Sequence, residues 1–203
     1  MGIPALVGIV SVICIVQARI GSQRFPGKVL ADLHGHPVIW HVYTRCHQAV
    51  PNTVVAIPAG RRDDPLAEYL NTIDAPVFRW EGPENDVLGR YAACLKSHPA
   101  EWVVRVTGDC PLVEPAVIRG MVKRAQDTGK MYVSNTHPRS VPSGFDVEVI
   151  HSARLNWLNH YTAPAAREHV TQYISSSGHY PHLSVDTPAD LDRIRALMTC
   201  SCS

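Results

Sequence analysis

The sequence has little net charge and few aromatic residues. Nineteen basic and 18 acidic side chains leave 203 residues with a formal charge of +1, and aromatic residues make up 7% of the chain. Without a broad basic surface, we expect no nucleic-acid partner. The apolar fraction of 45% is ordinary, so the chain can bury a core, and residues 1–203 fit a single domain.

Apolar runs long enough to span a membrane and cysteine pairs with CxxC spacing are missing as well. None of the six cysteines forms a CxxC pair, so reduced thiols in a cytoplasmic protein are the simplest interpretation. The apolar N-terminal segment 3–16 has no basic residue before it, is too short to cross a bilayer and runs directly into charged loop residues. We expect a leader and a buried strand there, and no membrane partner.

Short β-branched runs alternate with helical patterns over the first 130 residues, which predicts a three-layer α/β/α sandwich around a mostly parallel sheet. The predicted buried strands are Val12–Gln17, Thr53–Ile57 and Trp102–Val106. Apolar spacings of three and four predict the helices Pro37–Ala49, Asp64–Thr72, Glu84–His98 and Pro115–Asp127.

The pattern changes after residue 130. Further strands are predicted at Met131–Ser134, Phe145–Ile150 and Leu183–Val185, the second of them as an edge or antiparallel strand. Further helices are predicted at Ser152–His160, Ala165–Ser175 and Pro188–Met198, the last one capped by Thr187 with Asp190 in its first turn.

The loop Ala18–Lys28 follows the first predicted strand and can bind phosphate. Gly21 and Gly27 let the backbone curl, and Arg19, Arg24 and Lys28 supply three cations for an anion. It is neither a Walker A loop nor a dinucleotide fingerprint, because its glycine spacing differs and Val29 follows Lys28. The alternative is a solvated basic surface loop.

This loop resembles that of the cytidylyltransferase family of CMP-Kdo synthetases and acylneuraminate cytidylyltransferases, especially the branch named for a spore coat polysaccharide biosynthesis protein. The family pattern A-R-x-x-S-x-R-x-P-G-K is matched throughout, and G-x-P follows at Gly35–Pro37. The resemblance implies a Rossmann-like, GT-A-like nucleotide-diphospho-sugar transferase fold. It also implies that Arg19, Ser22, Arg24 and Lys28 bind the phosphates of CTP, with help from the backbone near Ala18 and Gly21.

Two aspartates are candidate Mg²⁺ ligands. Asp109 follows a strand in T-G-D-C-P, and hard carboxylate oxygens suit Mg²⁺. The resemblance makes G-D-x-P the metal motif and D-T-P-x-D-L, which begins at Asp186, the source of a second carboxylate. The alternatives are a turn or helix cap at Asp109 and a carboxylate at a helix start for Asp186.

The acceptor side is expected in the segments G-F-D-V-E-V and R-E-H-V-T, which the same branch shares. We predict that Asp146, Glu148, Arg167 and His169 border the acceptor, with Arg167 pairing an acceptor carboxylate. The alternatives are a solvated strand face for the two acids and a helix-surface position for His169. Arg79 is expected near the base or ribose. These assignments divide the domain into a nucleotide-binding half, 12–130, and an acceptor-binding half, 131–203.

The expected reaction is an in-line attack on the α-phosphorus of CTP with release of pyrophosphate, and the acceptor is a sugar acid or a similar acidic molecule. Lys28, Arg19, Arg24 and Asp109 are the predicted catalytic residues. A homodimer is possible. Three alternatives stay open: another triphosphate with a sugar phosphate, a non-catalytic nucleotide-binding module, and a glycosyltransferase, although Pro111 interrupts the D-x-D motif of that class.

Overall fold

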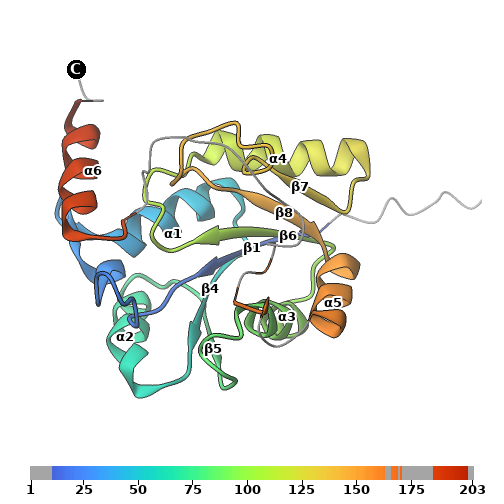
Figure 1. Ribbon diagram of the computed structural model, residues 1–203, viewed down its shortest axis with the longest axis horizontal. Coiled ribbons are helices and arrows are strands. Elements are labelled where there is room, and N and C mark those ends of the chain that lie inside the picture. Colours follow the sequence, from blue (N-terminus) through green and yellow to red (C-terminus); the bar gives the residue numbers. More distant parts are fainter. Residues whose placement is uncertain (1–10, 163–165, 169, 171–184, 201–203) are drawn as a thin grey trace, which may run out of the picture.

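A six-stranded sheet forms the centre of the protein (Figure 1). The computed structural model describes residues 11–162, 166–168, 170 and 185–200. Four strands run parallel, β8 is antiparallel to β6, and β7 is antiparallel to β8. In spatial order the strands are β5 (Val77–Trp80), β4 (Thr53–Pro58), β1 (Val12–Gln17), β6 (Trp102–Thr107), β8 (Glu148–His151) and β7 (Tyr132–Ser134).

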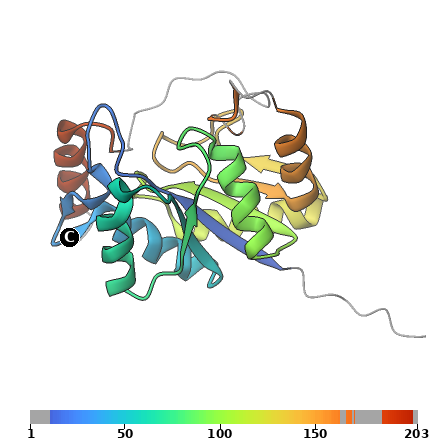
Figure 2. The same ribbon diagram turned by 90° about the horizontal axis from the view of Figure 1, so that it is seen from below.

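Helices cover both faces of this sheet, which confirms the predicted three-layer α/β/α fold. One face packs against α1 (Val38–Ala49), α2 (Asp64–Thr72) and α4 (Pro115–Thr128). The other packs against α3 (Val87–Ser97) and α5 (Ser152–Tyr161), which lie side by side in both views (Figures 1 and 2). Because β1 and β4 are buried between the two layers, their sequences are apolar almost throughout.

Three sequence predictions need correction. The strand β5 was not predicted, because its four residues are only partly buried at the sheet edge and carry no clear alternation. The helix predicted from Glu84 begins at Val87, since the Asp86 side chain accepts a hydrogen bond from the Gly89 amide (2.8 Å) and acts as the N-cap. The strand predicted over Phe145–Ile150 begins only at Glu148. It is antiparallel to both neighbours, in agreement with the predicted edge or antiparallel strand, but it lies inside the sheet and β7 is the edge.

The helix α6 (Pro188–Cys200) begins where the sequence predicts. Asp190 accepts hydrogen bonds from the Thr187 amide (2.9 Å) and hydroxyl (2.8 Å), while the Asp190 amide donates to that hydroxyl (3.2 Å). The predicted helix Ala165–Ser175 falls mostly outside the described residues. Of the predicted strand Leu183–Val185 only the last residue is described, and it is not in a strand.

A third apolar cluster fixes α6 against the loop that follows β1. Val185, Leu191 and Ile194 pack with Leu33 and Val38. Leu33 belongs to a small hairpin of β2 (Asp32–Leu33) and β3 (His36–Pro37). This contact between distant segments brings residue 186 to the carboxyl end of the sheet. Within the described segments, no helix combines the length and apolarity needed to cross a membrane.

Candidate functional site

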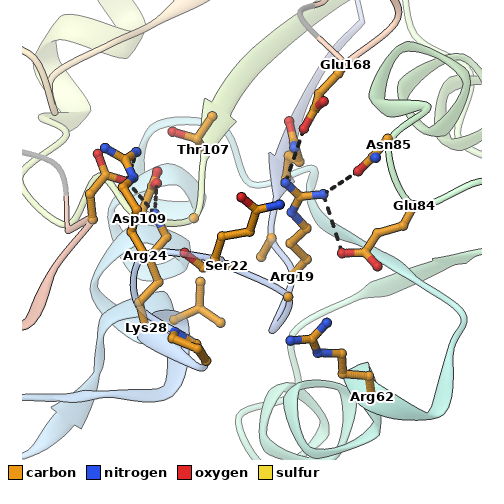
Figure 3. A pocket seen from close by; sticks show the side chains of 18 of the residues that line it. Arg19, Ser22, Arg24, Lys28, Arg62, Glu84, Asn85, Thr107, Asp109 and Glu168 are labelled. Atoms are coloured by element: carbon orange, nitrogen blue, oxygen red, sulfur yellow. Dashed lines mark hydrogen bonds and ion pairs between the residues drawn. The ribbon is translucent and has the colours of Figure 1, made fainter. Parts of the chain in front are cut away.

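A cleft of about 1130 Å³ opens at the carboxyl ends of the parallel strands (Figure 3). The loop after β1 forms its floor, and short segments after β4, β5 and β6 form its walls. In an open α/β sheet this edge is where ligands bind. The lining includes the predicted residues Ala18, Arg19, Gly21, Ser22, Arg24, Lys28, Asp109 and Asp186.

Two cations and two carboxylates interlock at one end of the cleft. The Lys28 ammonium lies 2.5 Å from Oδ2 of Asp109 and 2.8 Å from Oδ1 of Asp186. The Arg24 guanidinium approaches the same Asp186 oxygen at 2.9 Å. Lys28 is buried, whereas 68% of the Arg24 side chain is exposed. Residues 80 and more positions apart in sequence therefore form one charged cluster.

Local backbone features place these groups. Gly27 has a φ of 73°, a left-handed conformation that favours glycine, and it turns the chain into a short 3₁₀ segment that begins at Lys28. Across the cleft, the Gly108 amide donates to the Gln17 carbonyl (2.7 Å). A side chain at Gly108 would meet the Ala18 Cβ at 2.8 Å. The absence of a side chain therefore lets the turn that carries Asp109 approach the loop.

The surroundings of the charged cluster keep the Lys28 ammonium and the Cys110 thiol protonated. Burial lowers the pKa of Lys28, but the charge of Asp109 and hydrogen bonds to Asp109 and Asp186 outweigh it and raise the pKa above its usual value. Lys28 is therefore an ammonium at neutral pH. Burial, reinforced by the charge of Asp109, raises the pKa of the neighbouring Cys110 thiol well above its ordinary value. A protonated thiol is a poor nucleophile, so Cys110 has a packing role.

Arg19 points away from this cluster, although it belongs to the same loop (Figure 3). Its guanidinium lies 3.4 Å from Glu84, 3.0 Å from the Asn85 side-chain oxygen and 3.3 Å from Glu168. The sequence suggested three cations around one polyphosphate. The structure instead divides them between two ends of the cleft.

Arg79 does not line the cleft. It pairs with Asp64 at 2.6 Å and donates to the carbonyls of Ala59 and Gly60, so its partners belong to the outer turn after β4. Arg62, which lies in the segment after β4, lines the cleft instead. Because ligands bind beyond the carboxyl ends of parallel strands, a cation shortly after such a strand is the sequence signal that could have identified Arg62.

The described residues predicted for the acceptor side do not line this cleft. Arg139 pairs with both carboxylate oxygens of Asp146, at 2.6 and 3.2 Å. Glu148 is 3% exposed, pairs with Arg105, and accepts a hydrogen bond from the Tyr132 hydroxyl (2.6 Å). Since Glu148 is buried, the interpretation of a solvated strand face is wrong for this residue.

Arg167 borders a separate hollow of about 710 Å³ beside α3 and α5. Its guanidinium contacts Asp86 at 2.8 Å and the Asn159 side chain at 2.5 Å. These contacts tie the short segment at Arg167 to the start of α3 and to α5. His169 lies outside the described residues.

Arg90, in the segment Asp86–Tyr91 whose sequence also fits the family branch, supports the backbone at the cleft residue Glu84. This side chain is fully buried and donates to the Glu84 carbonyl at 2.5 Å, while its Nε and Nη1 atoms have no hydrogen-bond partner among the described residues. Burial lowers the pKa of Arg90. On the neighbouring side, Asp63 accepts a hydrogen bond from the Ile20 amide (2.7 Å) and so anchors the loop after β1.

The donor set fits a hard divalent cation. One oxygen of Asp109 and one of Asp186 converge on a single point, where the Lys28 nitrogen now lies. In the described part of the chain, no three acidic, histidine or cysteine side chains come together as a possible metal site. Two carboxylates with phosphate and water completing the shell are typical of Mg²⁺, and a complete protein cage is not required.

Comparisons with known proteins identify the family. The model of the family described as cytidylyltransferase matches residues 13–195. The chain is 29% identical to the spore coat polysaccharide biosynthesis protein SpsF of Bacillus subtilis, over 92% of this chain and 85% of that protein. Its structure resembles a cytidylyltransferase from Leptospira borgpetersenii with a TM-score of 0.86 and 25% identity, covering 95% and 88% of the two chains. At 18% identity and a TM-score of 0.69, CMP:2-keto-3-deoxy-manno-octonic acid synthetase complexed with CTP has the same fold over 94% and 99% of the two chains.

Proposed function

The chain belongs to the cytidylyltransferase family and is thus a nucleotidyltransferase, and we propose that it transfers CMP from CTP to a sugar acid or similar acidic acceptor with release of pyrophosphate. One observation carries the proposal: Arg24 and Lys28 meet Asp109 and Asp186 at the carboxyl edge of the sheet. Cations that can bind phosphate and carboxylates that can hold a metal therefore lie within one cleft.

The roles follow from charge and position. Arg24, Lys28 and the amides of the loop bind the triphosphate and stabilise the charge that grows on the leaving pyrophosphate. Asp109 and Asp186 would hold Mg²⁺, which neutralises phosphate charge and lowers the pKa of an attacking hydroxyl. Such a transfer asks the protein mainly for orientation and electrostatic stabilisation, so no protein nucleophile is needed.

The opposite end of the cleft suits the nucleoside. Arg19, Glu84 and Asn85 offer donors and acceptors to a base and a ribose. Arg79 is not part of this proposal, because its described partners lie on the outer turn.

Among the described residues predicted for the acceptor side, Asp146 is the one that we propose to lie near the acceptor. Asp146 precedes β8 by two residues, and the start of β8 pairs with Arg105 near the carboxyl end of β6, the strand that leads to Asp109. Arg139, the partner of Asp146, is a cation that can pair with an acidic acceptor. A sugar acid agrees with the relative that makes CMP-linked 2-keto-3-deoxy-manno-octonic acid and with the polysaccharide role in the name of SpsF.

The test is pyrophosphate release with Mg²⁺, each of the four nucleoside triphosphates and a panel of sugar acids and sugar phosphates. We expect release with CTP and an acidic acceptor, and a product heavier than the acceptor by one CMP group. Release with another triphosphate and a sugar phosphate would favour a different nucleotidyltransferase. Release of a nucleoside diphosphate from a nucleotide sugar would indicate a glycosyltransferase.

Lys28→Ala should lower turnover by about 10²–10³-fold, the range for removing one donor that stabilises the transition state. The matched control is Lys123→Ala, because Lys123 forms only an exposed pair with Asp127 on α4. Steady-state rates of pyrophosphate release measure both. Equal rates for the two variants would remove Lys28 from the mechanism.

A further inference from the structure

The Lys28 ammonium lies at the point where the two candidate metal ligands converge. Its nitrogen is within 2.8 Å of one oxygen from Asp109 and one from Asp186. Lys28 is 9% exposed and Asp186 is 7% exposed, so this arrangement is part of the packed structure and not a surface contact. Lys28 and Arg24 carry two positive charges, which balance the two negative charges of Asp109 and Asp186.

A Mg²⁺ ion bound by the same two oxygens would lie about 2.0–2.1 Å from each of them. That position overlaps the place of the ammonium group, and the two cations would repel each other strongly in a half-buried site. We infer that Lys28 occupies the metal position until a nucleoside triphosphate binds, so that the cleft takes up the metal only together with the nucleotide. This inference rests on the proposed nucleotidyl transfer.

The nucleotide can release the carboxylates because it offers the cations better partners. A triphosphate brings several negative charges and many acceptor oxygens, to which Lys28 and Arg24 can turn. Lys28 has a flexible four-carbon stem, and most of the Arg24 side chain is in solvent, so both charged groups can turn toward a bound phosphate. The freed oxygens of Asp109 and Asp186 are then available to the metal that accompanies the phosphates.

Binding of Mn²⁺, followed by the EPR signal of the free ion, tests the inference without using activity. For the wild-type protein we expect Mn²⁺ binding to be about 10–100-fold tighter in the presence of a non-hydrolysable CTP analogue than in its absence, a usual size of coupling between ligands. The Mn²⁺ bound by the analogue alone and the Mn²⁺ bound by the Asp109→Asn variant are measured separately and subtracted. Equally tight binding without the analogue would overturn the inference.

Lys28→Met tests the cause of that coupling. The variant should bind Mn²⁺ without nucleotide at least about tenfold more tightly than the wild type. The double variant Lys28→Met, Asp109→Asn should lose the gain. The matched control is Arg24→Met, which also removes a cation from Asp186 but leaves Lys28 in place. Its gain should be smaller.

The outcomes separate the inference from the proposed function. No gain in Lys28→Met, or an equal gain in Arg24→Met, overturns the inference even if the wild type turns over CTP. A gain in Lys28→Met supports it even if no acceptor is found. If Lys28→Met does not fold, the nucleotide dependence of Mn²⁺ binding by the wild type still decides. If Mn²⁺ does not bind with any triphosphate analogue, both the proposed function and the inference fail.

Discussion

Replacing Glu148 by alanine tests whether this residue serves the fold or the acceptor. Glu148 comes from β8, is 3% exposed, and forms an ion pair with Arg105 of the neighbouring strand β6. It also accepts a hydrogen bond from the Tyr132 hydroxyl at 2.6 Å. In the alanine variant the Arg105 charge loses this carboxylate while 18% of its side chain is exposed.

Removing one partner of a buried ion pair costs about 3–5 kcal/mol, because the remaining charge stays desolvated. For a chain of this size, each kcal/mol lowers the melting temperature by about 2–4 °C, so we expect a loss of about 6–20 °C. Urea unfolding followed by circular dichroism gives the free energy, and a thermal scan gives the melting temperature. Glu148→Gln should lose less, because the amide still accepts the hydrogen bond from Tyr132.

Asp127→Ala is the control, because Asp127 pairs with Lys123 on an exposed helix face, where 59% and 76% of the two side chains are in solvent. Its expected cost is about 0.3–0.5 kcal/mol. The argument would be refuted if Glu148→Ala were as stable as this control. Normal stability combined with a large rise in the KM of the acceptor would return Glu148 to the acceptor site.

Two further predictions concern packing and pH. Gly108→Ala should lower the free energy of unfolding by about 1–3 kcal/mol and lower turnover, because the new methyl group meets the Ala18 Cβ at 2.8 Å. The control is Gly120→Ala, whose methyl group meets nothing within 4 Å. Equal unfolding curves for the two variants would contradict the packing argument. Burial lowers the pKa of His41 below its ordinary 6.5, although its ring donates to the Leu33 carbonyl at 2.7 Å. The folded state therefore binds fewer protons than the unfolded chain, and stability falls as the pH drops through 6.5. His41→Gln should lose less free energy of unfolding between pH 8 and 5 than the wild type, and equal losses would contradict this assignment.

The layered fold could be predicted because its causes are local. Runs such as Val12–Gln17 are apolar almost throughout because they lie between two helical layers, and helices such as Pro115–Thr128 carry one apolar face. Helix ends were also readable where a side chain near in sequence makes the cap, as at Thr187. The strand Val77–Trp80 was missed because an edge strand with mixed burial carries little periodic signal.

The loop after β1 and the Gly-Asp turn after β6 were visible in the sequence, and the order of strands predicts that both lie at one edge of the sheet. Sequence by itself therefore determined which residue types meet there. It did not determine which cation pairs with which carboxylate. Lys28 and Arg24 meet Asp186 only because α6 packs on the β2–β3 hairpin, and Arg19 turns to the other wall.

Packing between distant segments sets the partners of a charged side chain. The tertiary structure therefore decided which charged residues line the cleft, which local sequence patterns could not show. Glu148 has the spacing of a surface residue in β8, yet β7 and β6 enclose it beside Arg105. Arg167 resembles a carboxylate-binding residue, yet Asp86 and Asn159 engage it outside the cleft. Such choices depend on desolvation and on the nearest opposite charge, and both arise only when the chain has folded.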